Sequence, residues 1–183
     1  LPGGYDEIYD RIVRFGELFS TTILHHYMKL AGYENRLFEA EKIILTDSNF
    51  RDARVDWKLT QIAIQRKLFT YFQEKKGRIG LTQGFIGADA KGRPVTLGRE
   101  GSDYTAAAIA YCMRVGELTV WKDVPGVMNA DPAWFDKPVK IDTLSFLEAI
   151  ELAWFGARIF HPKTIKPLEN AGITLYVKPF HNP

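Results

Sequence analysis

The stretch Thr96-Leu97-Gly98-Arg99-Glu100-Gly101-Ser102-Asp103 decides the fold of this chain. Its glycines allow the backbone to approach a ligand closely, and Arg99 adds a planar fork of donors suited to carboxylate or phosphate. Ser102 is a favoured N-cap residue. The alanine-rich residues 104–113 behind it predict a helix, whose N-terminus presents N–H groups and partial positive charge. The spacing predicts an anion-binding loop, and a plain turn before a well-capped helix is the alternative.

Helices and strands alternate on both sides of this loop. The predicted helices cover residues 5–31, 56–73, 104–113, 145–155 and 163–171, and the predicted strands cover residues 40–45, 78–86, 95–97, 118–121, 140–142 and 173–177. Such alternation is typical of an α/β fold with a mostly parallel central sheet and helices on both faces, a three-layer α/β/α sandwich. Ligands of such sheets bind at the carboxyl ends of strands. Gly84, Arg99 and Asp123 lie at or just past predicted strand ends, so we expect them at one edge.

The first predicted helix is amphipathic. Its apolar residues recur at spacings of three and four: Tyr5, Ile8, Ile12, Phe15, Phe19, Ile23, Tyr27 and Leu30. A stripe of this kind is typical of the face with which a helix packs against a core. Glu17 lies on the opposite face, where a solvated surface glutamate is the ordinary interpretation.

Composition limits the class of protein. A chain of 183 residues with 46% hydrophobic residues is long and apolar enough for a globular domain with a substantial core. Its net charge of +2 gives no argument for nucleic acid or for an anionic membrane. Cys112 is the single cysteine, so an internal disulfide is excluded. With neither a signal-peptide pattern nor an apolar run that spans a bilayer, we expect a cytoplasmic protein.

Five motifs follow one another in a characteristic order: Phe15–Thr21, Thr82–Gly87, Thr96–Thr105, Asp123–Pro132 and Phe155–Pro162. In this order and spacing the chain resembles the aspartate kinases, or aspartokinases, of the amino-acid kinase family. Other branches of that family, such as the acetylglutamate, glutamate and uridylate kinases, are less similar around the first motif and within the last.

The resemblance implies transfer of the γ-phosphoryl group of ATP to the β-carboxylate of L-aspartate. The product would be 4-phospho-L-aspartate, in the first step of lysine, threonine and methionine biosynthesis. A carboxylate is already a nucleophile, so the enzyme needs to hold two anions in line and neutralise developing charge, without a general base. The cofactors would be ATP and Mg²⁺ carried on the nucleotide, with no metal site made by the protein itself. Nucleic acid and membrane are not expected partners, and the full-length protein would be a homo-oligomer.

Site residues follow from the same resemblance. Glu17 would receive the amino group of the substrate, and Arg99 would clamp a carboxylate. Ser102 and Asp103 would lie in the substrate and phosphoryl region, which makes Arg99 and Asp103 the catalytic candidates. The nucleotide-binding candidates are Lys122, Asp123, Met128, Asp131 and Arg158.

The chain departs from the family pattern at five positions. These are Glu100, where glycine is frequent, Lys122 for threonine, Met128 for tyrosine, Ala133 for arginine and Arg158 for lysine. Four of the five fall in the predicted nucleotide region.

The resemblance also predicts the domain organisation. The family opens with a strand, a glycine-containing loop and a lysine that meets the transferring phosphate, and regulatory domains follow the kinase domain. We therefore expect residues 1–183 to form part of a catalytic domain and to be nearly inactive by themselves. Two alternatives stay open: another amino-acid kinase acting on a different acid, and a non-catalytic ligand-binding fragment of the same fold.

Overall fold

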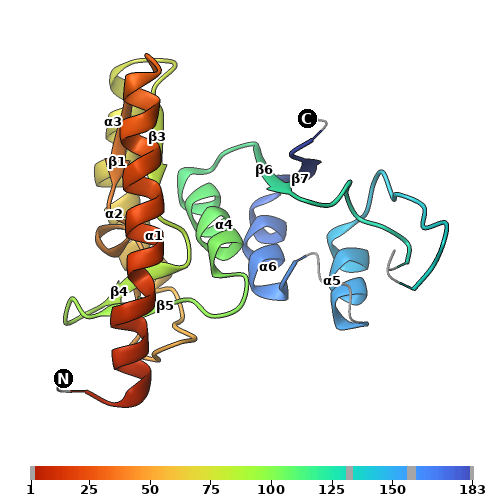
Figure 1. Ribbon diagram of the computed structural model, residues 1–183, viewed down its shortest axis with the longest axis horizontal. Helices are drawn as coiled ribbons and strands as arrows, with labels where there is room; N and C mark the ends of the chain where they lie inside the picture. Colours follow the sequence, from red (N-terminus) through yellow and green to blue (C-terminus); the bar gives the residue numbers. More distant parts are fainter. Residues whose placement is uncertain (1–2, 131–133, 156–159, 182–183) are drawn as a thin grey trace. The chain divides into compact units, whose positions relative to one another are not determined.

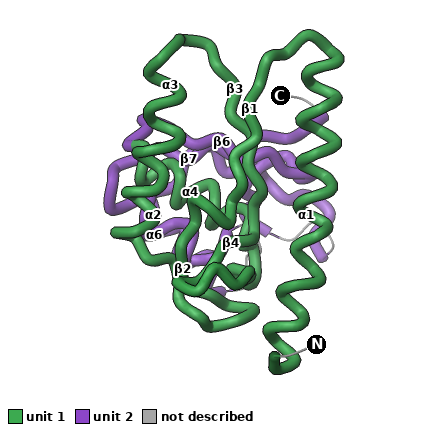
Figure 2. The backbone as a smooth tube through the Cα atoms, turned by 90° about the vertical axis from the view of Figure 1, so that its left-hand side faces the viewer, with its two compact units in different colours: residues 1–113 green, residues 114–183 purple. Residues whose placement is uncertain are grey.

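The structure is a computed structural model that describes residues 3–130, 134–155 and 160–181. The chain divides into two compact units, unit 1 over Leu1–Met113 and unit 2 over Arg114–Pro183 (Figure 2). Unit 1 contains, in order, α1 (Tyr5–Leu30), β1 (Asn35–Phe38), the 3₁₀ turn η1 (Ala40–Lys42), β2 (Leu45–Thr46), α2 (Trp57–Ile64), the π-helix η2 (Gln65–Phe69), α3 (Thr70–Glu74), β3 (Ile79–Thr82), β4 (Ile86–Asp89), β5 (Pro94–Thr96) and α4 (Gly101–Met113) (Figure 1).

The strands of unit 1 pair mostly in parallel. β1 pairs with β3 in parallel, from Asn35 opposite Ile79 to Phe38 opposite Thr82. β2 pairs in parallel with β4, and β4 pairs with β5 as the antiparallel exception. These pairings form one two-stranded and one three-stranded sheet. The predicted α/β class with mostly parallel strands is therefore confirmed.

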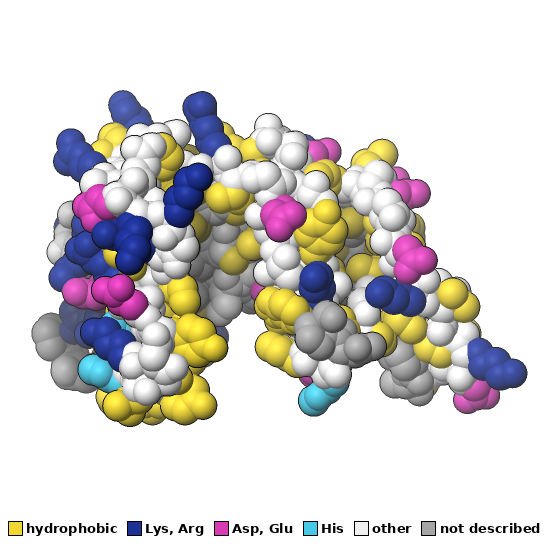
Figure 3. Space-filling view, turned by 90° about the horizontal axis from the view of Figure 1, so that it is seen from above, with side chains coloured by type: hydrophobic (Ala, Val, Ile, Leu, Met, Phe, Trp, Pro, Cys, Tyr) yellow, Lys and Arg dark blue, Asp and Glu magenta, His cyan; other side chains and the backbone are white. Residues whose placement is uncertain are grey.

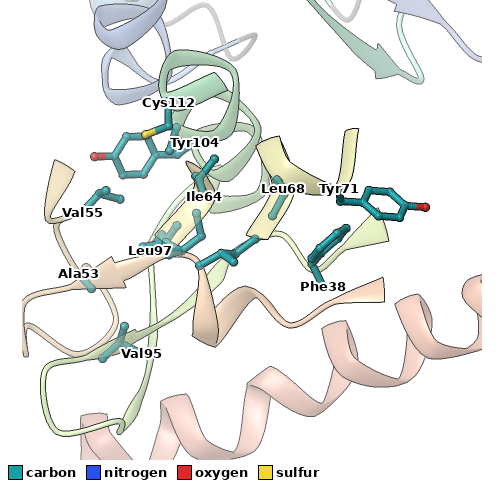
Figure 4. Packing of buried hydrophobic residues seen from close by; sticks show 13 residues of the cluster. Phe38, Ala53, Val55, Ile64, Leu68, Tyr71, Val95, Leu97, Tyr104 and Cys112 are labelled. Atoms are coloured by element: carbon teal, nitrogen blue, oxygen red, sulfur yellow. The ribbon is translucent and has the colours of Figure 1, made fainter. Parts of the chain in front are cut away.

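Helices cover both faces of these strands. α1 packs against β1, β3 and β5, whereas α2 and α4 pack against each other and contact β2 and β4 (Figure 2). The hydrophobic core lies on the side of α2 and α4, where Ile64, Leu68, Leu97 and Tyr104 come together (Figure 4). None of the thirteen buried residues in this cluster belongs to α1.

α1 has its expected length but packs with the opposite face from the one its stripe predicts. The apolar stripe is largely exposed, from Tyr5 at 76% to Leu30 at 89%, and hydrophobic side chains gather where α1 is seen end-on at the lower left of Figure 3. The buried residues of α1 are Glu7 and Asp10. Polar side chains face the strands because hydrogen bonds and ion pairs satisfy them there, including a pair between Glu7 and Arg93.

The helix predicted over residues 56–73 is interrupted. Asp56 caps α2 by accepting a hydrogen bond from the Leu59 N–H at 2.9 Å, and a π-helical turn then separates α2 from α3. A π-turn shifts the later side chains around the axis. Ile64 at the end of α2 and Leu68 within the π-turn are buried, while Leu59, Ile62, Phe69 and Phe72 remain partly exposed, against the expectation that most of this apolar set points inward.

Two strand predictions in unit 1 need correction. Residues 40–45 do not form one strand, because the chain turns through η1 between β1 and β2 and only Leu45 belongs to β2. Residues 78–86 form two strands that are broken at Gln83–Phe85, where Phe85 takes a left-handed φ of 68°. That break matters for the site described below.

Unit 2 contains β6 (Glu117–Lys122), α5 (Phe146–Trp154), α6 (Pro162–Ala171) and β7 (Thr174–Pro179). β6 and β7 pair in parallel, and Val120, Phe160 and Ile165 form a small core. The capping box of Ser145 and Glu148 is confirmed at the start of α5. The strand predicted over residues 140–142 is reduced to one antiparallel bridge between Met128 and Lys140. Over the described ranges, no helix combines the length and hydropathy that a membrane crossing requires.

Candidate active site

The predicted anion-binding loop follows β5. Gly98 has a φ of 79° and Glu100 a φ of 54°, so the chain turns through two left-handed residues around Arg99. α4 begins at Gly101, three residues before the predicted start at Tyr104. Ser102 therefore lies in the first helical turn and is not the N-cap. The loop still delivers Ser102 and Asp103 to the helix N-terminus, where backbone N–H groups lack intrahelical partners.

Arg99 is the exposed cation of this loop. Within the described parts of the chain, its guanidinium makes no hydrogen bond or ion pair. Ser102 is also exposed, and Asp103 is half-buried and has a partner. The Oε2 atom of Glu100 is buried and has no hydrogen-bond partner among the described residues. The exposed Arg99 guanidinium is therefore available to a ligand. The burial of the Glu100 Oε2 atom, by contrast, carries an energetic cost.

The break between β3 and β4 lies against the first turn of α4. A Cβ atom on Gly84 would come within 2.8 Å of the Ser102 Cβ atom. A Cβ atom on Gly101 would come equally close to the Phe85 ring. The Phe85 N–H donates to the Thr105 Oγ1 atom at 3.0 Å. Small residues and one hydrogen bond therefore hold the end of β3 against the anion-binding loop.

The same break is tied to the turn of α1 that carries Glu17. The Gln83 side chain is fully buried; its Nε2 donates to Thr21 Oγ1 at 3.0 Å, and its Oε1 accepts from the Ala40 N–H at 2.8 Å. The Thr21 hydroxyl in turn donates to the Glu17 carbonyl at 2.6 Å. Gln83–Gly84 thus links the Glu17 turn to Ser102.

Glu17 is half-buried, and desolvation raises the pKa of its carboxyl. Burial disfavours the charged form of a carboxyl group, and a bound cation would reverse that effect. Glu17 is therefore suited to an ammonium ligand, which would replace the lost hydration.

Gln83 was not assigned a role from the sequence, although it stands in one of the quoted motifs. The sequence feature that could have indicated a role for Gln83 is a long polar side chain directly before a glycine at a strand end. A buried amide that bridges two elements is expected to be fully hydrogen-bonded, as Gln83 is.

The nucleotide-binding candidates belong to unit 2. Lys122 ends β6, and its Nζ atom lies 5.7 Å from the centroid of the Phe160 ring. Asp123 follows as an exposed residue, and Met128 is half-buried at its bridge to Lys140. Asp131 and Arg158 lie outside the described residues, as does Ala133. The joint arrangement of these residues with the substrate candidates stays a prediction.

The described residues contain no group of three or more His, Cys, Asp or Glu side chains that could hold a metal ion. Asp103 and Asp123 are the carboxylates among the described phosphoryl and nucleotide candidates. Mg²⁺ is usually bound through one or two carboxylates together with substrate phosphates. Either carboxylate by itself would fit a metal ion that arrives with a nucleotide.

Comparison with known proteins identifies the family. The pattern of the amino acid kinase family matches residues 5–179. The chain is 36% identical to the lysine-sensitive aspartokinase 3 of Escherichia coli (strain K12) over 168 residues, which are 92% of this chain and 37% of that protein. It is 35% identical to the chloroplastic aspartokinase 1 of Arabidopsis thaliana, over 95% of this chain and 31% of that one. The chain therefore spans about a third of these relatives.

The fold agrees with a solved structure. The crystal structure of E. coli aspartokinase III in complex with aspartate and ADP, in its R-state, superposes with a TM-score of 0.90 at 34% identity. The match covers 97% of this chain and 39% of that one.

Proposed function

The chain belongs to the amino acid kinase family, and on that premise we propose that it is part of the catalytic domain of an aspartokinase. The reaction would transfer the γ-phosphoryl group of ATP to the β-carboxylate of L-aspartate, giving 4-phospho-L-aspartate and ADP. The observation that carries the proposal is the likeness to E. coli aspartokinase III, whose structure holds aspartate and ADP. The resemblance of the residues around Glu17 and Arg99 to the aspartokinase motifs supports it.

The substrate side of the site belongs to unit 1. In the proposal, Glu17 binds the ammonium group of aspartate and Arg99 binds one of its carboxylates. The burial of Glu17 and the exposure of an unpartnered Arg99 guanidinium among the described residues support these roles. Ser102 and Asp103 would line the same substrate at the start of α4, with Arg99 and Asp103 nearest the reacting groups.

The chemistry then depends on position and charge. The β-carboxylate of aspartate attacks the γ-phosphorus in line, the bond to the β-phosphate oxygen breaks, and ADP leaves with the electron pair. No proton is removed from the nucleophile, so no base is required. Arg99 and the N–H groups at the start of α4 would stabilise charge on the transferring group. Asp103 would orient cationic groups and would not abstract a proton.

The nucleotide side would come from unit 2. We propose contacts to ATP from Lys122, Asp123, Met128, Asp131 and Arg158. Mg²⁺ would enter on the nucleotide phosphates and neutralise their charge. The end of β6 supports this assignment, because Lys122 ends a parallel strand and Asp123 follows it at the carboxyl edge.

Several wider features are proposals of the same kind. The full-length protein would be a cytoplasmic homo-oligomer in amino-acid biosynthesis. Another amino-acid kinase and a non-catalytic ligand-binding fragment are the competing functions. Glu17 distinguishes aspartokinase from the first of these competing functions, because the Glu17 carboxylate matters only for a substrate with a free amino group.

The test is an ADP-release assay on the full-length protein with aspartate and with succinate, which lacks the amino group. We expect turnover with aspartate and at least a hundredfold lower kcat/KM with succinate, in line with the rejection of ligands that leave a buried polar group unpaired. Glu17→Gln should reduce the ratio of kcat/KM for aspartate to kcat/KM for succinate. Glu39→Gln, at an exposed glutamate elsewhere in unit 1, should leave this ratio unchanged. Equal turnover of the two acids would refute aspartate specificity. Binding of ATP and aspartate by calorimetry without turnover would favour the non-catalytic alternative.

A further inference from the structure

Asp10 is a fully buried carboxylate on α1 that the proposed reaction does not use. Its Oδ2 atom accepts hydrogen bonds from the backbone N–H of Arg51 and of Thr96, each at 2.9 Å. Its Oδ1 atom accepts from the Thr96 hydroxyl at 2.8 Å. Among the described residues no cation pairs with Asp10. A buried carboxylate is costly unless it is hydrogen-bonded, so these three donors account for its presence.

The three donors come from the loop around Arg51 and from Thr96 at the end of β5, which meet at Asp10. Arg51 has a left-handed φ of 66°. The Ala53 N–H donates to the Thr96 carbonyl at 2.9 Å. Gly98 lies so close to the first loop that an added Cβ atom would come within 2.6 Å of Asp52 Oδ1 and 3.1 Å of the Arg51 carbonyl. Asp10 therefore holds the loop around Arg51 against the beginning of the anion-binding loop.

Arg99 lies three residues beyond Thr96 on the same loop. Between them, Leu97 is fully buried and its N–H donates to the Phe85 carbonyl at 2.8 Å. After Arg99, the Gly101 N–H closes the turn onto the Gly98 carbonyl at 3.1 Å. The Arg99 side chain is exposed and gains no support from the described residues around it. Its position is therefore set by the backbone anchors on either side, of which Thr96 is the one bound to α1.

We propose that Asp10 is a positioning residue for Arg99. By accepting three hydrogen bonds from Arg51 and Thr96, it fixes the start of the anion-binding loop relative to α1, which also carries Glu17. Two groups proposed to bind opposite ends of one substrate would thereby keep a fixed separation. The inference rests on the proposed function, in which Glu17 and Arg99 bind the ammonium and a carboxylate of aspartate.

The kinetic test compares three variants of the full-length protein. Asp10→Ala removes all three acceptors and should raise the KM for aspartate about tenfold or more, because small misplacements of a binding group are costly. The KM for ATP should change less than twofold. Asp10→Asn should restore most of the aspartate affinity, since its amide oxygen can accept both N–H groups while its NH₂ donates to the Thr96 hydroxyl, which can also accept.

Glu7→Ala is the matched control. Glu7 is the other buried acid of α1, and it pairs with Arg11 and Arg93 without contacting Thr96 or Arg51. This variant should lower the melting temperature and leave the KM for aspartate unchanged. An aspartate KM that rises equally in Glu7→Ala and Asp10→Ala would overturn the proposal, because the effect would then be general destabilisation. If Asp10→Ala does not fold, Thr96→Val removes only the hydroxyl bond and should raise the same KM by a smaller factor.

Amide hydrogen exchange tests the inference independently of turnover. In Asp10→Ala, the amides of residues 96–101 should exchange faster than in the unsubstituted protein, while those of β1 and β3 should not change. Unchanged exchange in residues 96–101 would overturn the proposal. If the unsubstituted protein does not phosphorylate aspartate, the proposed function fails, and faster exchange confined to this loop would still support the positional role of Asp10.

Discussion

Gly84 and Ser102 lie in direct contact, although eighteen positions separate them in the chain. A Cβ atom on Gly84 would come within 2.8 Å of the Cβ and Oγ atoms of Ser102 and within 2.9 Å of its Cα atom. The end of β3 is thus pressed onto the first turn of α4. Since one of the crowded atoms belongs to the backbone, the contact cannot be relieved by a side-chain rotation alone.

Gly84→Ala is therefore expected to destabilise the protein by about 1–3 kcal/mol, the usual range for overpacking, and to weaken aspartate binding. Gly16→Ala makes the same chemical change on α1, where an added Cβ atom meets nothing within 4 Å. That control should stabilise the protein by about 0.5–1 kcal/mol, because alanine favours a helix over glycine. Urea unfolding of both variants measures the change in the free energy of unfolding. A change of the same sign in both variants would contradict this account of the contact between Gly84 and Ser102.

Arg99→Lys should raise the KM for aspartate markedly and change the KM for ATP less. Lysine keeps the charge but cannot make a planar, two-pronged contact with a carboxylate. Arg54→Lys, at another exposed arginine of unit 1, is the control and should be neutral. Steady-state kinetics on the full-length protein is the measurement, and an unchanged aspartate KM in Arg99→Lys would rule out the clamp.

Binding of aspartate should release a proton through Glu17. Desolvation raises the pKa of this carboxyl in the empty site, so part of it stays protonated at a pH where an ordinary glutamate is ionised. An ammonium ligand favours the ionised form. The affinity for aspartate should then increase as pH rises through the pKa of Glu17 and level off above it.

Calorimetry in two buffers of different ionisation enthalpy would count the released protons. The Glu17→Gln variant should bind aspartate weakly, with no such release. Proton release of the same size in both proteins would assign it to another group and contradict the role of Glu17.

Glu100→Gly should stabilise the protein by relieving two unfavourable features. Glu100 adopts a left-handed φ of 54°, which costs about 1–2 kcal/mol for a residue with a side chain. Its buried Oε2 atom also lacks a described partner, which typically costs about 1–3 kcal/mol. Glycine loses more backbone entropy on folding, which offsets part of the gain.

Arg114→Gly provides the comparison, because Arg114 has nearly the same φ, 53°, and an exposed side chain. In urea unfolding, Arg114→Gly should increase the free energy of unfolding by less than Glu100→Gly does. A larger gain at Arg114 would show that the Glu100 carboxylate is well accommodated.

Lys122→Thr should weaken ATP binding in the full-length protein, because a charge would be lost near the proposed phosphate positions. Independently of ATP, Lys122 makes a cation–π contact with the Phe160 ring, and such a contact is worth about 0.5–1 kcal/mol at an exposed site. The loss should shrink when Glu100→Gly is present, if the two charges are coupled. A double-mutant cycle on ATP affinity at low and moderate salt decides this. Strictly additive effects would leave Lys122 as a surface lysine.

The turn and the helix over residues 96–113 were predictable from local chemistry. Glycine at 98 and 101 and the alanine-rich run after them specify a turn and a helix, and the structure has a left-handed Gly98 followed by α4. Only the boundary was misplaced, because Gly101, Ser102 and Asp103 belong to the helix. The capping box of Ser145 and Glu148 was read from spacing in the same way. Patterns formed by residues within a few positions of one another therefore predicted the local structure well.

Features that depend on distant partners were not predictable. The periodicity of α1 shows that its two faces differ, but it does not say which face packs on the strands; Asp10 is buried because Thr96 and Arg51 supply its donors. Likewise, the role of Gln83 depends on Thr21 and Ala40. Residues 40–45 resembled a strand, yet the chain turns through η1 there and only Leu45 joins a strand, in the pairing of β2 with β4.

The outward apolar face of α1 has a consequence for the behaviour of residues 1–183 in solution. A helix of 26 residues is about 39 Å long, and Ile12, Phe19, Ile23 and Tyr27 are each more than half exposed along it. A continuous apolar surface of that length promotes self-association. The apparent mass of this chain by light scattering should therefore climb with concentration, and ligand titrations will measure a single equilibrium only in dilute samples.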